Sequence, residues 1–170
     1  MVLPVRTYGD PVLRRKASAI ESLTEEHKDI ILNMKETMLK KDGIGLAAPQ
    51  IALSERIIVI NLSEDPDKPD PQVFFNPDIT DTAGDLIPYE EGCLSIPGIT
   101  GEVLRPEKIT LKARNSEFRE IIIENAEGML ARVLQHEIDH LNGVLFVDRL
   151  SLGAKSLIQG KLKKMARENR

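Results

Sequence analysis

The sequence predicts an α+β fold in which mostly antiparallel sheets surround a central helix, with one further helix near each end. Three segments carry apolar residues at helical spacing, and several short β-branched segments lie between the first two. Helices and strands do not alternate along the chain, so parallel βαβ units are disfavoured. The 170 residues suit one domain, and we expect residues 1–170 to form it.

The first helix follows Ser22, which stands three residues before Glu25 as in a capping box. Apolar residues then recur every three or four positions until Gly43. The residues of this stripe are Ile30, Ile31, Met34, Met38 and Leu39. The spacing predicts an amphipathic helix that ends at the glycine.

Strands are expected from β-branched and alternating segments. Residues 56–62 are short and β-branched, which is typical of a buried strand, and the Asp- and Pro-rich residues 64–71 predict a surface loop. Apolar and polar residues alternate over 109–114, and residues 118–123 supply a pairing partner across a turn near Asn115.

The second and third helices lie in the last third of the chain. Residues 126–141 carry one apolar stripe that Met129 and Val133 widen, so this helix is expected to be central. Residues 154–167 predict a C-terminal helix that turns Leu157, Ile158, Leu162 and Met165 towards the body.

Composition excludes several classes of protein. Lys plus Arg is 23 and Asp plus Glu is 27, a net charge of −4, which disfavours a DNA-binding protein. The apolar runs are too short to cross a bilayer, and the N-terminus lacks the pattern of a secretory signal, so we expect a cytoplasmic protein without membrane contact. The single cysteine cannot form an internal disulfide, so it is an inert core residue, a nucleophile or a metal ligand.

A metal-binding motif lies in the expected central helix. His136 and His140 flank Glu137 in the pattern H-E-x-x-H. Four residues advance about 6 Å along a helix and return to the same face, so both imidazoles can reach one ion. On a strand the same spacing is roughly 13 Å, which is too far for a shared ion. Glu137 is then placed to accept a proton from metal-bound water.

The third ligand distinguishes the classes of metalloprotein. A metzincin would need His at the position of Phe146, so that class is excluded. A zincin could recruit Glu168 near the C-terminus, whereas Cys93 beside Gly92 would complete a Cys-His-His site with an open water position. A non-enzymatic binding module, whose metal is closed by four protein ligands, is the remaining alternative.

Residues 43–50, Gly-Ile-Gly-Leu-Ala-Ala-Pro-Gln, superficially fit a dinucleotide-binding fingerprint. That fingerprint needs a strand before the glycines and a helix after them, whereas here the order is reversed. The segment fits better as tight backbone beside an extended ligand, with Gln50 as an amide donor near a reacting oxygen. A plain turn that closes the first helix is the alternative.

Three segments together resemble the peptide deformylase family. They are residues 43–50, residues 91–95 (EGCLS) and residues 135–143 (QHEIDHLNG), in that order, and residues 8–14 (YGDPVLR) resemble the opening of the family. The resemblance implies a metal-dependent hydrolase that removes the N-formyl group from the N-terminal formylmethionine of newly synthesised polypeptides and releases formate.

The resemblance also implies roles for residues. Cys93, His136 and His140 would hold one divalent ion, commonly Fe²⁺, with Zn²⁺ or Ni²⁺ able to occupy the site. Glu137 would act as general base and then acid, while Gln50 and the backbone N–H of Leu94 would stabilise the oxyanion. The resemblance implies that Ile44, Gly45 and Gly92 contact the backbone of the N-formylmethionyl nascent peptide. The apolar side chains of Met129 and Val133 lie beside the expected site and would suit the methionine side chain of that peptide, with an ordinary core role as the alternative.

The C-terminal segment, residues 151–170, holds six basic residues and one acidic residue, a net charge of +5 that leaves −9 for the rest. Basic charge on an exposed helix is usually a solvated face. The functional alternative is contact with ribosomal RNA, which would suit an enzyme that acts on nascent chains.

Overall fold

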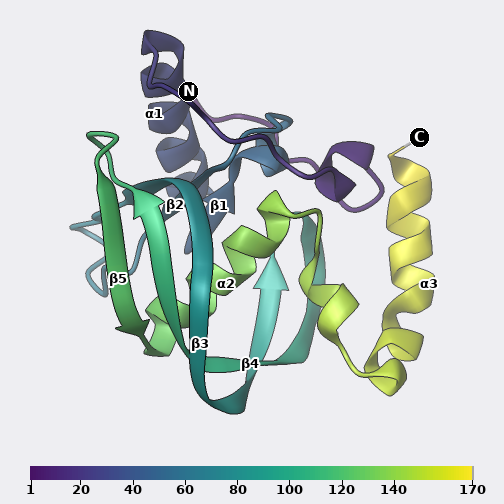
Figure 1. The fold of residues 1–170 in the computed structure, drawn as a ribbon. Coiled ribbons are helices and arrows are strands. Elements are labelled where there is room, and N and C mark those ends of the chain that lie inside the picture. The colour runs from purple at the N-terminus through teal and green to yellow at the C-terminus, as the bar shows by residue number, and fades with distance from the viewer. Residues whose placement is uncertain (170) are drawn as a thin grey trace.

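The structure is a computed structural model and describes residues 1–169. These residues form three α-helices and one five-stranded sheet with the strand order β1-β2-β3-β4-β5 (Figure 1). All neighbouring strands pair antiparallel, which confirms the predicted α+β class. The helices are α1 (Glu25–Lys40), α2 (Gly128–Leu141) and α3 (Leu152–Glu168). The strands are β1 (Gly45–Ala47), β2 (Ile57–Ile60), β3 (Gln72–Cys93), β4 (Ile96–Arg114) and β5 (Glu120–Ala126).

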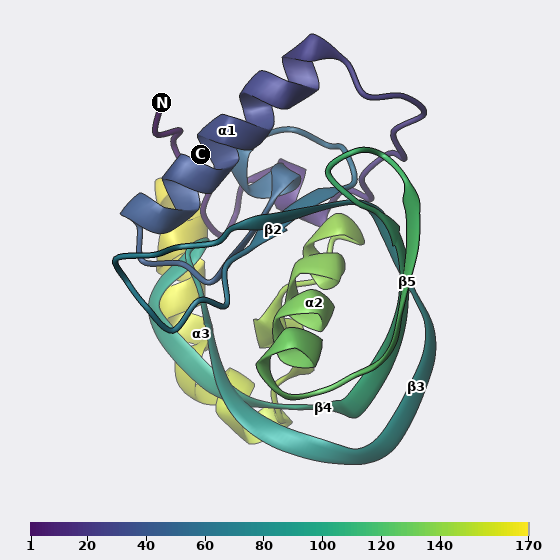
Figure 2. The same ribbon diagram turned by 90° about the vertical axis from the view of Figure 1, so that its left-hand side faces the viewer.

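The sheet curves around α2, which lies inside it as the central helix (Figure 2). The curvature is possible because β3 and β4 are long and their pairing shifts register at several points, for example between Ala83 and Leu86. One apolar cluster fills the space between the helix and the sheet, and it includes Leu134, Ile138 and Leu141 of α2. This packing fixes the helix that carries the H-E-x-x-H motif.

Helix α1 covers another part of the sheet, where Met34 and Met38 pack with residues of β1, β2 and β3. The predicted capping box at Ser22 and Glu25 is wrong by two residues. Thr24 is the N-cap, because its hydroxyl accepts the backbone N–H of His27 while His27 Nδ1 accepts the N–H of Thr24. An imidazole nitrogen thus takes the place of the expected carboxylate. The helix ends at Lys40, three residues before the glycine that was expected to stop it.

The strands agree with the predictions in position and differ in length. Residues 57–60 form β2, residues 64–71 lie in the loop before β3, and the expected pair over 109–123 is the junction of β4 and β5. The long hairpin of β3 and β4 was missed because residues 81–90 are exposed. Such a segment shows no buried face in its sequence and is held by backbone pairing to β4.

Helix α3 lies on the outside, along the N-terminal segment and the 3₁₀ turn η3 (Phe146–Arg149). Its contacts with the body are made by Leu162, Ala154, Ile158 and Met165. Leu157, which was expected to face the body, is 85% exposed. Arg170 lies outside the described residues. Within the described residues, no helix has the length and apolar content that a membrane span requires.

Candidate metal centre and active site

The metal-binding motif converges with the single cysteine. His136 and His140 project from α2, and Cys93 ends β3; their ligand atoms all lie within 4.8 Å of one another. The Sγ atom of Cys93 is 3.3 Å from Nε2 of His140. Atoms this close can share one ion at the usual distances of roughly 2.0–2.3 Å. Glu168 is exposed at the end of α3 and takes no part in this group.

His136 is oriented by a buried carboxylate. Its Nδ1 atom is 2.9 Å from Oε1 of Glu91, which leaves Nε2 to face the ligand group. Glu91 is 4% exposed and also accepts hydrogen bonds from Arg105 and Arg132, at 2.7–2.9 Å. Burial opposes its ionisation, but the hydrogen bonds from Arg105 and His136 hold the pKa of Glu91 well below its usual range.

The same network reaches a second carboxylate on α2. Asp139 accepts Nη1 of Arg105 at 2.9 Å and a bidentate pair from Arg149 at 2.6 and 2.8 Å. Arg105 therefore bridges Glu91 of β3 and Asp139 of α2 from its place on β4. Charged groups that lose water need such partners, so the network fixes the distance between β3 and α2. The elements that carry Cys93, His136 and His140 are therefore held in a fixed relative position.

The sequence alone indicated no role for the charged residues of this network, which are Glu91, Arg105, Arg132, Asp139 and Arg149. Glu91 stands in the EGCLS motif and Asp139 stands inside H-E-x-x-H, so their place beside predicted ligands was the available signal. Arg105 and Arg132 are isolated in the sequence and become partners only when β4 and α2 meet in the fold.

The donor set fits a divalent transition metal. Burial opposes the protonation of His136, yet hydrogen bonds to Cys93 and Glu91 raise its pKa to about 10, so the site attracts positive charge. Burial lowers the pKa of His140 well below its usual value, which keeps that imidazole neutral. One thiol and two imidazoles suit iron, zinc or nickel.

Glu137 occupies a space that a glycine leaves open. A Cβ atom at Gly45 would lie 2.8 Å from the carboxyl carbon of Glu137, so a larger residue would collide with the carboxylate. Glu137 is buried, and its Oε2 atom has no hydrogen-bond partner among the described residues. Burial raises the pKa of Glu137 to about 7. A carboxylate with this pKa can both accept and return a proton near neutrality.

Gln50 presents its amide nitrogen to the same site. Its Oε1 atom accepts the N–H of Ala47 at 2.9 Å, so Nε2 faces Ser95 Oγ at 3.0 Å and Cys93 Sγ at 3.5 Å. Leu94 lies in the turn between β3 and β4, directly after Cys93. Residues 43–50 thus form β1 and the 3₁₀ turn η2 (Ala48–Ile51) beside the ligand group and do more than close the first helix.

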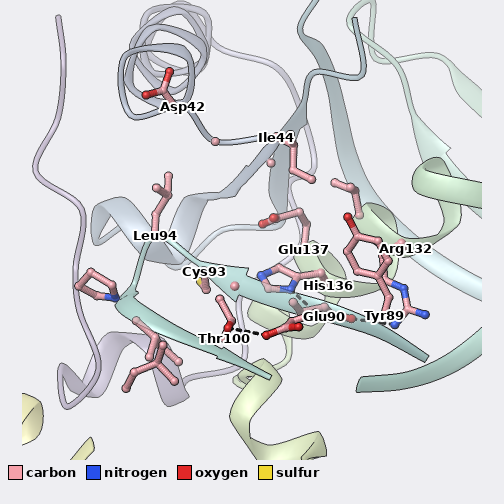
Figure 3. Close-up of a pocket in the computed structure, with 18 of the residues that line it drawn as sticks. Asp42, Ile44, Tyr89, Glu90, Cys93, Leu94, Thr100, Arg132, His136 and Glu137 are labelled. Carbon is pink, nitrogen blue, oxygen red and sulfur yellow. Dashed lines mark hydrogen bonds and ion pairs between the residues drawn. The ribbon is translucent and has the colours of Figure 1, made fainter. Parts of the chain in front are cut away.

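These residues surround one pocket of about 480 Å³ (Figure 3). Glu137, His136 and Cys93 face its centre, and Tyr89 and Arg132 form one side. All five residues predicted to contact substrate line it, whereas the buried His140 is not among its lining residues. The five are Ile44, Gly45, Gly92, Met129 and Val133.

Two strand edges flank the pocket. Among the described strands, β1 pairs only with β2, and the last part of β3, near Gly92, pairs only with β4. Their other edges therefore offer backbone N–H and C=O groups beside the ligand group. An extended peptide can add to such an edge as a further strand.

Comparison with known proteins identifies the family. The sequence profile described as polypeptide deformylase matches residues 2–156. A peptide deformylase of Natranaerobius thermophilus is 49% identical over 145 residues, which cover 85% of this chain and 90% of that protein. A peptide deformylase of Salinibacter ruber is 45% identical over 97% of this chain and 89% of that protein.

Solved structures agree. A peptide deformylase of Legionella pneumophila has a TM-score of 0.87 at 40% identity and covers 99% of this chain and 98% of its own. A peptide deformylase of Synechococcus elongatus, solved in complex with actinonin, has a TM-score of 0.85 at 43% identity and covers 94% of this chain and 85% of its own. With this agreement in sequence and fold over nearly its whole length, the chain belongs to the polypeptide deformylase family, the enzymes that remove the N-formyl group from new polypeptides.

Proposed function

We propose that the chain deformylates N-formylmethionyl nascent peptides with one divalent ion held by Cys93, His136 and His140. The observation that carries this assignment is the convergence of one thiol and two imidazoles within 4.8 Å, next to the buried carboxylate of Glu137. We assign Fe²⁺ as the resident ion from family membership, and the donor set suits Zn²⁺ and Ni²⁺ as alternatives.

Glu137 moves the proton in the proposed reaction. When bound, the ion supplies a Lewis acid that lowers the pKa of water to about 7. Glu137 takes a proton from the attacking water and later gives it to the leaving amine, which becomes the free N-terminus as formate departs. The pKa of about 7 at Glu137 suits both steps.

Gln50 and Leu94 stabilise the negative charge that develops on the formyl oxygen. The Nε2 group of Gln50 is already turned towards Cys93, and the backbone N–H of Leu94 is the second donor of the assignment. An oxyanion donor of this kind contributes about 2.7–4 kcal/mol to the transition state. Their effect therefore falls on kcat more than on KM.

The peptide lies along the free edges of the two strands. Ile44, Gly45 and Gly92 contact its backbone, because they line the pocket where β1 and β3 offer unpaired groups. Met129 and Val133 come from one side of α2 and, with Ile44, form an apolar wall for the unbranched methionine side chain.

Formate release measured together with metal content tests the assignment. Protein purified without oxygen should contain one ion per chain and should release formate from a formyl-Met peptide. Glu137→Ala should keep the ion and lose at least about 10²-fold in kcat, the usual contribution of a general base. The matched control Glu168→Ala, an exposed glutamate on α3, should leave both quantities unchanged. An active Glu137→Ala variant would contradict the assignment.

The basic face of α3 supports contact with ribosomal RNA as a second proposal. Lys161, Lys163, Lys164 and Arg167 are all exposed, while the rest of the chain is acidic. Phosphate contacts of this kind weaken steeply with salt. Reversal of the three lysines to Glu should abolish co-sedimentation with ribosomes at low salt. The control reverses three lysines of α1 and its C-terminal end, Lys35, Lys40 and Lys41. Equal binding of both variants would end the proposal.

A further inference from the structure

Ser95 is a buried polar residue in the turn that follows Cys93, and the reaction as assigned above gives it no role. Its exposed fraction is 0%, and its hydroxyl, its backbone N–H and its carbonyl each make a hydrogen bond within the protein. The hydroxyl accepts Nε2 of Gln50 at 3.0 Å, the backbone N–H donates to Sγ of Cys93 at 3.4 Å, and the carbonyl accepts the N–H of Tyr8 at 2.8 Å. Ser95 thus contacts both the proposed oxyanion donor and a proposed metal ligand.

The side-chain amide of Gln50 has one allowed orientation. A carboxamide is planar, and its two N–H bonds diverge at a fixed angle of about 120°, so one bonded N–H fixes the direction of the other. The N–H that donates to Ser95 leaves the second N–H to donate to Sγ of Cys93 at 3.5 Å, beside the pocket that both residues line. The reversed orientation would set an N–H group against the N–H of Ala47, which now donates to Oε1.

Both partners of this contact are themselves anchored. The N-terminal segment donates from the N–H of Arg6 to the carbonyl of Gln50 at 2.7 Å, and from Tyr8 to Ser95. The hydroxyl and the amide therefore meet between two fixed backbone positions. Donors held in place before the reaction stabilise developing charge best, because they need no reorganisation.

We propose that Ser95 is a positioning residue for deformylation, because its hydroxyl holds the Gln50 carboxamide with its second N–H directed at the Cys93 side of the pocket, where the formyl oxygen would bind. The inference rests on the proposed oxyanion role of Gln50. It adds a residue that never touches the substrate but sets the direction of the group that does. Loss of the hydroxyl leaves the amide anchored by the Ala47 N–H at Oε1 and by the longer contact of Nε2 with Cys93. Nε2 is then held less firmly, and the transition state loses an aligned donor.

The test combines two substitutions in a double-mutant cycle. Ser95→Ala should lower kcat for a formyl-Met peptide roughly 3- to 10-fold, the range of one neutral hydrogen bond, with KM and metal content unchanged. Gln50→Ala should lower kcat further than Ser95→Ala. In the Gln50→Ala background, Ser95→Ala should have no additional effect on kcat, because the amide that it orients is already gone.

A matched control separates positioning from loss of a buried hydroxyl. Thr37 is also 0% exposed, and its hydroxyl accepts the N–H of Leu3 and donates to the carbonyl of Asn33, within α1 and its contact with the N-terminal segment. Thr37→Val should cost stability in urea unfolding and leave kcat unchanged. Ser95→Ala should instead change kcat at a temperature where both variants are fully folded.

A spectroscopic readout follows the amide itself. In the zinc-loaded protein, the side-chain N–H signals of Gln50, assigned by their loss in Gln50→Ala, should exchange slowly with solvent. Ser95→Ala should speed that exchange, and Thr37→Val should not.

The outcomes separate the positioning role of Ser95 from the oxyanion role of Gln50. If Ser95→Ala lowers kcat by the same factor with and without Gln50, or has no effect where Gln50→Ala does, the positioning role is overturned alone. If Gln50→Ala leaves kcat unchanged, the oxyanion role and this inference fall together.

Discussion

Helices α2 and α3 have similar amphipathic sequences but hold their charges in opposite ways. Ten of the 14 residues of α2 are buried, among them Arg132, Glu137, Asp139 and His140. Among the described residues of α3, Leu162 alone is buried, and its lysines are in water. Arg132 and Asp139 of α2 are therefore held by buried ion-pair partners, whereas the lysines of α3 are hydrated. Catalytic geometry depends on the first arrangement, and electrostatic attraction of a partner needs only the second.

The largest expected difference between the two helices is the effect of replacing a proposed metal ligand. His140→Ala on α2 should remove the bound metal and lower kcat by roughly 10³-fold or more, since an ion of this kind contributes several kcal/mol. Lys164→Ala on α3 should change neither the metal content nor kcat. Metal analysis and formate release on the same samples measure both effects. A His140→Ala variant that keeps its metal and its activity would contradict the expected difference between α2 and α3.

The buried charges of α2 should also dominate stability. Arg105→Met leaves Glu91 and Asp139 without a shared partner and should destabilise the fold by about 3–5 kcal/mol. Arg167→Met on α3 removes an exposed charge and should stay within about 0.5 kcal/mol. Urea unfolding of the two variants measures the contrast. Similar values would mean that the network around Glu91 contributes nothing to the folded state.

The space beside Glu137 gives a third, smaller contrast. Gly45→Ala places a methyl group against the carboxylate, closer than van der Waals contact allows, and should displace it. We expect a loss of about 10²-fold in kcat, which is the lower end of the contribution of a general base. The metal content should not change. Normal kcat in the Gly45→Ala variant would show that Glu137 tolerates a displaced position.

The smallest expected effect is a gain in the stability of the folded protein. Gly160 lies in the middle of α3, and nothing lies within 4 Å of a Cβ atom added there. Gly160→Ala should stabilise the protein by about 0.5–1 kcal/mol, because alanine loses less backbone entropy in a helix. Thermal unfolding measures the gain, and formate release should be unchanged. A destabilised variant would indicate that α3 is packed more tightly than its exposure shows.

The same contrast explains what the sequence could predict. The apolar spacing of α2 and the H-E-x-x-H pattern are local, so the helix and the pair of imidazoles were predictable from adjacent residues. Cys93 was named because the chain has one cysteine in a distinctive segment. The roles proposed for these residues remain predictions until the substitutions are made.

The rest depends on contacts between distant segments. Arg105 and Arg132 find Glu91 only after β3, β4 and α2 have met, so no local pattern marks them. The hairpin of β3 and β4 was missed because residues 81–90 are exposed and show no burial pattern. The role of Ser95 was not predicted for the same reason, because its partner Gln50 lies 45 positions earlier in the sequence.

The distance along the chain between Cys93 and His140, 47 positions, has a consequence for folding kinetics. Closing a loop of this length costs entropy before any contact repays it, so an unfolded chain holds the ion poorly. The three proposed ligands come together only when α2 docks inside the curved sheet (Figure 2). The proposed ion would therefore bind late in folding and hold β3 and α2 together. Because the proposed ion would bind the native state in preference to the unfolded chain, we expect the melting temperature to rise with the concentration of that ion.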